Sequence, residues 1–266
     1  MRLIKLPVCH KVKSCFNSMV TEISKYKKEY VVKSYEADCH GFLRILTLLN
    51  WLQDIAVENA QYLGFGFEAC REQNLAWVGS NYVIQITRLP KIDEHITIET
   101  WPATGKLWGA IRDFVIKDSQ GNDIVKASSQ WVLINYELRR PVLLKKYFPE
   151  YKFLPERTID TDFPKIEATE GKTVTEFKVR FDDIDVNNHV NNAVYLLWAS
   201  ESVDSAYRMS HTVAAVEVCF KKEALYGESV AVYCDMQDNE STHIIKDKNS
   251  GQELAECRLK WRKITS

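Results

Sequence analysis

The segment from residue 182 to residue 192 carries the densest group of side chains that could do chemistry. Asp185, Asn187 and His189 stand two residues apart, so in an extended stretch their side chains would project to the same side. A carboxylate, an amide and an imidazole that converge could act in acid–base catalysis or stabilise an oxyanion. The alternative is that the acidic and amide residues form turns and caps, while His189 is simply hydrogen-bonded in place. We favour the functional interpretation.

The asparagines that end this segment suggest where negative charge could be held. Asn188, Asn191 or Asn192 could cap the following helix with a side-chain oxygen. Free N–H groups in the first turn of that helix would then face a developing oxyanion.

The elements beside this segment are predicted from the spacing of apolar residues. Residues 175–181 alternate like a half-buried strand, and Val190, Val194, Leu197 and Trp198 recur at helical spacing. We expect the strand to run straight into the helix, with the polar side chains at the joint.

A weak internal repeat gives the first half of the chain the same order of elements. Four residues recur 147 positions later: Asp38, His40, Trp51 and Asp54 correspond to Asp185, Asn187, Trp198 and Glu201. Residues 30–35 are the equivalent predicted strand. The equivalent helix is predicted from the spacing of Leu46, Leu49, Leu52, Ile55 and Ala56.

Further strands are predicted after each helix. The alternating segments are residues 80–87, 96–101, 111–117 and 127–135 in the first half, and 214–220, 229–235, 243–247 and 254–261 in the second. Residues 118–122 and 248–251 have the composition of hairpin turns. One helix followed by an antiparallel sheet, twice over, predicts an α+β protein with a tandem double hotdog fold, in which each curved sheet wraps a long helix.

The predicted domain boundaries follow from this repeat. Residues 1–27 form an extension, 28–148 an N-terminal hotdog, 149–171 a linker that contains Pro155 and Pro164, and 172–266 a C-terminal hotdog.

Composition limits the classes of partner. The chain has 266 residues and a formal net charge of −1, so no global field favours nucleic acid or an anionic membrane. No apolar stretch approaches the roughly 20 residues that a membrane span needs. The seven cysteines are scattered without a CxxC pair, which favours reduced thiols in a cytoplasmic protein over disulfides or a zinc site. We expect no metal and no cofactor.

The polar segment also resembles a known family. Residues 185–192 read DVNNHVNN and resemble the D-x-N-x-H-V-N-N segment of the acyl-ACP thioesterases, plant and bacterial enzymes that release fatty acids from acyl carrier protein (ACP). Residues 221–223 resemble the strand that carries the family's catalytic glutamate. Residues 105–113 and 131–140 resemble segments of the first half of the same enzymes, so the likeness covers about residues 28–262.

The resemblance implies a catalytic set of Asp185, Asn187, His189 and Glu223, which hydrolyses a fatty acyl thioester on ACP. Glu223 would act as the general base or align the water through Asn187, Asp185 would orient its neighbours, and His189 would stabilise the carbonyl oxygen. The alternative for Glu223 is a surface carboxylate at a sheet edge.

One position departs from the family. Plant relatives place a cysteine directly after the glutamate, but Ala224 stands here, so direct attack by water is favoured over a thiolate nucleophile. Cys219, four residues before Glu223, is interpreted as a core residue.

The first half has Phe42 and Leu89 at the positions equivalent to His189 and Glu223. We therefore expect this half to be non-catalytic. The resemblance implies that its helix lines a pocket for the acyl chain, although plain core packing explains the same residues.

The expected partner is ACP, which is acidic and carries the acyl chain on a phosphopantetheine arm. Three basic pairs are candidates for docking it: Arg139 and Arg140, Lys145 and Lys146, and Lys221 and Lys222. Each pair could equally belong to a solvated face. A homodimer is left open. A plastid location would require that residues 1–27 form a transit segment.

Three other functions compete. An acyl-CoA thioesterase would perform the same chemistry on another carrier. A non-catalytic hotdog protein that binds acyl thioesters would need no Glu223 and would usually carry a DNA-binding segment. A hydratase could also use an Asp and a His, but Asn187 and the double-domain resemblance argue against it.

Overall fold

The structure is a computed structural model that describes residues 23–163, 165–171 and 173–264. The predicted extension at residues 1–27 therefore lies mostly outside the described residues. Its last two residues belong to the first strand, which begins at Tyr26.

The elements follow one order in each half. The first half contains β1 (Tyr26–Val31), the 3-10 turn η1 (Ser34–Glu36), α1 (Ile45–Tyr62), α2 (Phe67–Glu72), β2 (Leu75–Ile86), β3 (His95–Lys106), β4 (Gly109–Asp118), β5 (Asp123–Asn135), β6 (Arg140–Pro141) and α3 (Leu144–Tyr147). The second half contains β7 (Thr173–Lys178), the 3-10 turn η2 (Phe181–Asp183), α4 (Asn192–Glu201), α5 (Ser205–Arg208), β8 (His211–Phe220), β9 (Ser229–Gln237), β10 (Glu240–Asp247) and β11 (Glu253–Lys263).

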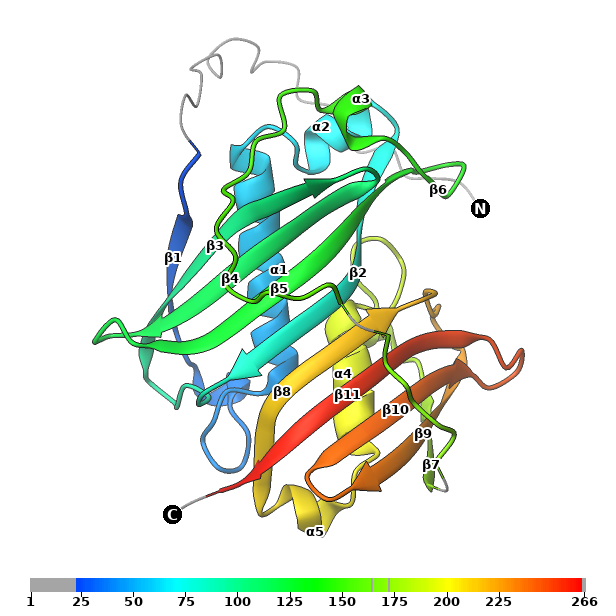
Figure 1. Ribbon diagram of the computed structural model, residues 1–266. Helices are drawn as coiled ribbons and strands as arrows, with labels where there is room; N and C mark the ends of the chain where they lie inside the picture. The colour runs from blue at the N-terminus through cyan, green and yellow to red at the C-terminus, as the bar shows by residue number, and fades with distance from the viewer. Residues whose placement is uncertain (1–22, 164, 172, 265–266) are drawn as a thin grey trace.

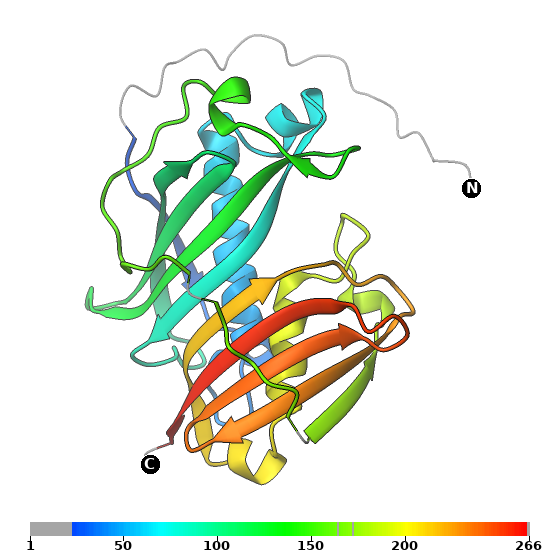
Figure 2. The same ribbon diagram turned by 45° about the vertical axis from the view of Figure 1, so that its right-hand side comes forward.

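The strands form one continuous antiparallel sheet. Its order is β1-β3-β4-β5-β2-β8-β11-β10-β9-β7, and β6 pairs with β5. The two halves meet where β2 pairs with β8, from Asn81 opposite Cys219 to Gln85 opposite Ala215. The curved sheet has α1 and α4 on one face (Figures 1 and 2). The α+β class and the double hotdog arrangement are thus confirmed.

The two central helices differ in length. Helix α1 has 18 residues, whereas α4 has only 10. Leu49, Leu52 and Ile55 of α1 are fully buried, as their spacing predicts. Val190 precedes α4 instead of belonging to it, because it pairs with Ile184 in an isolated β-bridge. Both helices contribute to one hydrophobic core that also contains side chains from the two halves of the sheet.

The strands do not run straight into the helices. The strand predicted at residues 30–35 corresponds to β1, which ends earlier, at Val31. The chain then forms the 3-10 turn η1 at Ser34–Glu36. In the second half η2 and a tight turn separate β7 from α4. The two predicted hairpin turns are confirmed. Gly121 and Gly251 have φ values of 84° and 69°, a conformation that glycine adopts without strain.

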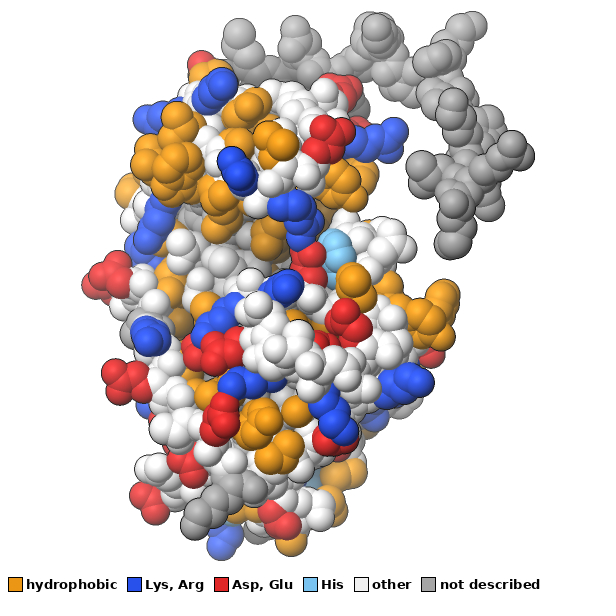
Figure 3. Space-filling view, turned by 90° about the vertical axis from the view of Figure 1, so that its right-hand side faces the viewer, with side chains coloured by type: hydrophobic (Ala, Val, Ile, Leu, Met, Phe, Trp, Pro, Cys, Tyr) orange, Lys and Arg blue, Asp and Glu red, His pale blue; other side chains and the backbone are white. Residues whose placement is uncertain are grey.

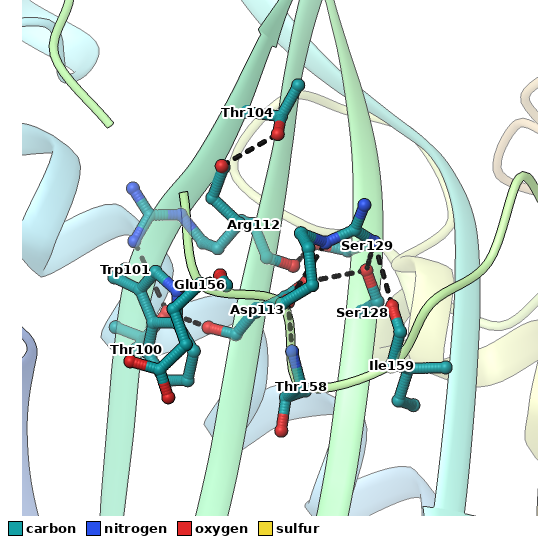
Figure 4. Close-up of polar contacts among 12 residues, drawn as sticks. Thr100, Trp101, Thr104, Arg112, Asp113, Ser128, Ser129, Glu156, Thr158 and Ile159 are labelled. Atoms are coloured by element: carbon teal, nitrogen blue, oxygen red, sulfur yellow. Dashed lines mark hydrogen bonds and ion pairs between the residues drawn. The ribbon is translucent and has the colours of Figure 1, made fainter. Parts of the chain in front are cut away.

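The segment predicted to be the linker is fastened to the outer face of the first-half sheet. Asp113 of β4 is fully buried and accepts hydrogen bonds from Ser128 Oγ (2.7 Å), Arg157 Nε (3.1 Å) and the Thr158 N–H (2.6 Å) (Figure 4). The indole of Trp101 donates to the carbonyl of Glu156 at 2.9 Å. Residues 156–158 of the linker are therefore held by side chains of β3, β4 and β5.

Among the described residues, no helix is both long enough and apolar enough to cross a membrane.

Candidate active site

Residues 185–189 form a tight turn, not the extended stretch that the sequence suggested. The N–H of Asp185 donates to the carbonyl of His189 at 2.8 Å, and the N–H of Asn188 donates to the carbonyl of Asp185 at 3.0 Å. Asn188 has a φ of 65°, which asparagine tolerates better than most residues. Because the chain reverses here, a spacing of two does not place the three side chains on one face.

The first half contains an equivalent turn, but it lacks side chains equivalent to His189 and Glu223. The N–H of Asp38 donates to the carbonyl of Phe42 at 2.8 Å, and the N–H of Gly41 donates to the carbonyl of Asp38 at 3.0 Å. The Asp38 carboxylate accepts from the N–H of His40 at 2.9 Å, as that of Asp185 accepts from Asn187 at 2.8 Å. Each aspartate thus shapes its own turn, so part of what Asp185 does is structural.

Asp185 also fixes the amide of Asn187. Its second carboxylate oxygen, Oδ2, accepts from Asn187 Nδ2 at 3.3 Å. Asn187 is exposed, and Asp185 is partly buried. The amide nitrogen carries two hydrogens, so one remains for a ligand.

His189 and Glu223 come together across the turn. His189 Nε2 lies 3.3 Å from Glu223 Oε2, and their side chains are 23% and 34% exposed. This contact brings together a base and an imidazole that are 34 positions apart in the sequence. A pair open to solvent at this separation can exchange a proton with water or with a substrate.

Glu223 does not lie on a strand, contrary to the expectation from the resemblance. Strand β8 ends at Phe220, and Glu223 is in the loop that follows. The loop is fixed at Ala224, whose carbonyl accepts from the N–H of Val190 at 3.0 Å. In the first half, the N–H of Leu43 makes the same bond to the carbonyl of Pro90 at 2.9 Å. Leu89 therefore occupies the structural position of Glu223, as the repeat predicts.

The hydroxyl of Tyr195 holds both neighbours of Glu223. It accepts from the N–H of Ala224 at 2.9 Å and donates to the carbonyl of Lys222 at 3.4 Å. Tyr195 belongs to α4 and is 2% exposed, and burial raises the pKa of its hydroxyl, which stays protonated. The sequence does not indicate a role for Tyr195 at the site, because its apolar neighbours along the helix are typical of core residues.

Arg139 is a second residue of the site that was not predicted from the sequence to contact Glu223. Its Nη2 donates to Glu223 Oε2, the oxygen that also faces His189. The hydrogen bond to Glu223 raises the pKa of Arg139. The sequence indicated only that Arg139 belongs to a basic pair, and nothing in that pair reveals a contact 84 positions away.

Helix α4 begins at the site, and its cap is Asn191. Asn191 Oδ1 accepts from the N–H of Ala193 at 2.9 Å, which confirms one of the three predicted caps. Its carbonyl accepts from the N–H of Val194 at 2.9 Å. The prediction of free N–H groups is therefore wrong for Ala193 and Val194, whereas the N–H of Asn192 has no acceptor among the described residues.

The cap also links the two halves. Asn191 Nδ2 donates to Asn50 Oδ1 at 3.2 Å, and Gln53 Nε2 donates to Asn191 Oδ1 at 3.3 Å. Both partners are on α1, so the first half helps to hold the start of the helix next to the site.

Cys219 is half-buried on β8, where it pairs with Asn81 of β2. Burial raises the pKa of its thiol, which disfavours the thiolate that a nucleophile needs.

The basic pairs differ in their contacts. Lys221 Nζ forms ion pairs with Glu253 at 2.6 Å and Glu256 at 2.8 Å, so it is engaged within its own half. Arg140, Lys145, Lys146 and Lys222 are exposed.

Comparisons with known proteins agree with this architecture. The family model for the "Acyl-ACP thioesterase N-terminal domain" matches residues 23–150, and that for the "Acyl-ACP thioesterase C-terminal domain" matches residues 166–263. The chain is 26% identical to oleoyl-acyl carrier protein thioesterase 2, chloroplastic, of Arabidopsis thaliana, over 94% of this chain and 80% of that one. It is 27% identical to the oleoyl-acyl carrier protein thioesterase, chloroplastic, of Coriandrum sativum, over 86% of this chain and 67% of that one.

Two solved structures share the fold. An acyl-ACP thioesterase from Bacteroides thetaiotaomicron superposes with a TM-score of 0.82 at 23% identity, over 90% of this chain and 98% of that one. A 12:0-ACP thioesterase from Umbellularia californica gives a TM-score of 0.78 at 21% identity, with the same coverage of both chains. Because the two family models together span nearly all of the described residues, this chain belongs to the acyl-ACP thioesterase family.

Proposed function

We propose that the protein hydrolyses fatty acyl-ACP by direct attack of water at a site formed by Glu223, His189, Asn187 and Asp185. The observation that carries this proposal is the 3.3 Å contact between His189 Nε2 and Glu223 Oε2. It occurs where the second half departs from an otherwise equivalent turn in the first half, which has Phe42 and Leu89 instead. Shared backbone geometry with different side chains supports a role in chemistry for the pair.

Glu223 is the general base in this mechanism. Its Oε2 is engaged by Arg139 and His189, whereas Oε1 has no partner among the described residues. Oε1 takes a proton from water as the water oxygen attacks the thioester carbonyl carbon. The carbon–sulfur bond then breaks, and the proton passes to the pantetheine thiolate, giving a free fatty acid and ACP.

Donors around the turn stabilise the oxyanion. The remaining hydrogen of the Asn187 amide, oriented by Asp185, is one donor, and the N–H of Asn192 is another. The imidazole of His189 adds a third. A well-aimed donor to an oxyanion lowers the barrier by about 3 kcal/mol.

The acyl chain is assigned to the first half. Leu48, Leu49 and Leu52 of α1 give an apolar interior there, although they are fully buried in the core and an acyl chain would have to displace neighbouring side chains. The acidic ACP is expected to dock on the exposed cations Arg140, Lys145, Lys146 and Lys222. A cytoplasmic location, a homodimer and the domain boundaries stay predictions.

The test compares Glu223→Gln and His189→Ala with Glu137→Gln, an exposed control near the same surface. Each is assayed with a panel of acyl-ACP thioesters of different chain length, and circular dichroism checks the fold. We expect the two site variants to lose turnover while the control retains it. Retained turnover in folded Glu223→Gln would refute the assignment.

The same panel, presented as acyl-CoA, tests the nearest alternative. We expect kcat/KM to be higher for acyl-ACP. Equal or higher values for acyl-CoA would favour that carrier instead.

A further inference from the structure

The first half of the molecule reaches into the proposed active site through one side chain. Arg139 lies in the turn between β5 and β6, and its guanidinium crosses the boundary between the halves to Glu223. Histidine, acidic and basic side chains come together near the middle of the face shown in Figure 3.

The backbone around Arg139 is shaped to present this side chain. Its N–H donates to the carbonyl of Asn135 at 3.0 Å, and Asn135 Oδ1 accepts from the N–H of Leu138 at 2.8 Å. Arg139 has a φ of 53°, a left-handed conformation that residues with a side chain rarely adopt. The pairing of Asn135 with Arg140 closes the turn directly after Arg139.

The contact gives the two oxygens of the Glu223 carboxylate different surroundings. Arg139 Nη2 and His189 Nε2 both face Oε2. A carboxylate held at one oxygen by a guanidinium loses rotational freedom, so its other oxygen points in a defined direction.

We propose that Arg139 is a positioning residue that orients Glu223, so that the second-half site is incomplete without the first half. This inference rests on the proposed function of Glu223. It separates Arg139 from its neighbour Arg140, which is exposed and has no ion pair among the described residues. The two arginines that look alike in sequence therefore have different tasks.

Positioning and carrier docking predict different kinetics. A positioning residue affects the chemical step on every thioester, whereas a docking residue affects the KM for acyl-ACP alone. Misplacing a catalytic group by about 1 Å can cost about 100-fold in rate.

The experiment measures kcat and KM for Arg139→Ala, Arg139→Lys and the matched control Arg140→Ala on one acyl chain carried by ACP and by CoA. We expect Arg139→Ala to lower kcat about 10- to 100-fold on both carriers, and Arg139→Lys to retain more activity. Guanidinium chloride at millimolar concentration should restore part of the kcat of Arg139→Ala. It should not raise the kcat of Arg140→Ala, whose expected defect is a higher KM for acyl-ACP.

Each outcome decides the inference. An unchanged kcat with a raised KM for acyl-ACP alone, or no rescue of the kcat of Arg139→Ala by guanidinium chloride, would overturn it. Glu223→Gln separates the two proposals: if that variant is inactive while Arg139→Ala is fully active, only the role of Arg139 fails. If Glu223→Gln is active, the proposed function itself fails.

Discussion

Tyr195→Phe tests whether the position of Glu223 depends on its flanking backbone. The substitution removes only the hydroxyl that joins the N–H of Ala224 and the carbonyl of Lys222. The ring keeps its edge contacts with Trp198 and Phe220, at centroid distances of 5.3 and 5.6 Å. The change therefore leaves the packing in place and isolates the two hydrogen bonds.

The magnitude follows from burial. Ala224 is fully buried, so its N–H would lose its partner without access to water. An unsatisfied buried donor costs about 1–3 kcal/mol, which is the expected fall in the free energy of unfolding. The loop would also hold Glu223 in a less defined position. We therefore expect kcat to fall at least about 10-fold with little change in KM.

The assay combines urea unfolding with steady-state kinetics on acyl-ACP. Tyr207→Phe is the matched control, because its hydroxyl bonds Asn239 at 3.1 Å on an exposed surface of the second half. We expect the control to keep both stability and kcat. If Tyr195→Phe is destabilised but retains the full kcat, the hydroxyl does not position Glu223 and the reasoning is wrong.

Three further predictions concern pH, the repeat and docking. Burial between Ser202 and Ser241 lowers the pKa of His243 to about 3, against an ordinary value of 6.5, so below pH 6.5 only the unfolded state binds this proton. His243 should therefore reduce the free energy of unfolding by about 2 kcal/mol between pH 7 and pH 5, and urea titrations of His243→Gln should lack this slope. Asp38→Ala and Asp185→Ala should each cost about 1 kcal/mol of stability, but only Asp185→Ala should lower kcat; equal activities would make Asp185 purely structural. Arg140→Glu combined with Lys222→Glu should raise the KM for acyl-ACP more than that for acyl-CoA, and an equal rise for both would argue against docking there.

Local patterns predicted much of the fold. The turns at Gly121 and Gly251 depend on neighbouring residues only, and apolar periodicity is a property of a single helix or strand. The repeat, whose copies are 147 positions apart, holds for hydrogen bonds as well as for residue types, because Asp38 and Asp185 make equivalent bonds in their turns. The equivalence of Leu89 and Glu223 follows in the same way from the bonds at Pro90 and Ala224.

Features that join distant segments could not be predicted. The pairing of β2 with β8 has no sequence signature, since any strand edge offers the same backbone groups. The contact of Arg139 with Glu223 depends on that pairing and on a left-handed turn, so the sequence showed only two adjacent arginines. The prediction that residues 185–189 are extended was wrong. A side-chain acceptor such as Asp185 can stabilise a turn as well as take part in catalysis, and the sequence does not distinguish the two roles.

Glu223 is proposed to act as a base on water and not as a nucleophile toward the thioester. A single turnover with excess enzyme in ¹⁸O-labelled water distinguishes the two, with mass spectrometry of both the fatty acid and the peptide that contains Glu223. Direct attack predicts one ¹⁸O in the fatty acid, none in the peptide, and no acyl adduct on Glu223 when the reaction is quenched before completion. An acyl adduct on Glu223, or ¹⁸O in the Glu223 peptide with unlabelled fatty acid, would show that Glu223 is a nucleophile.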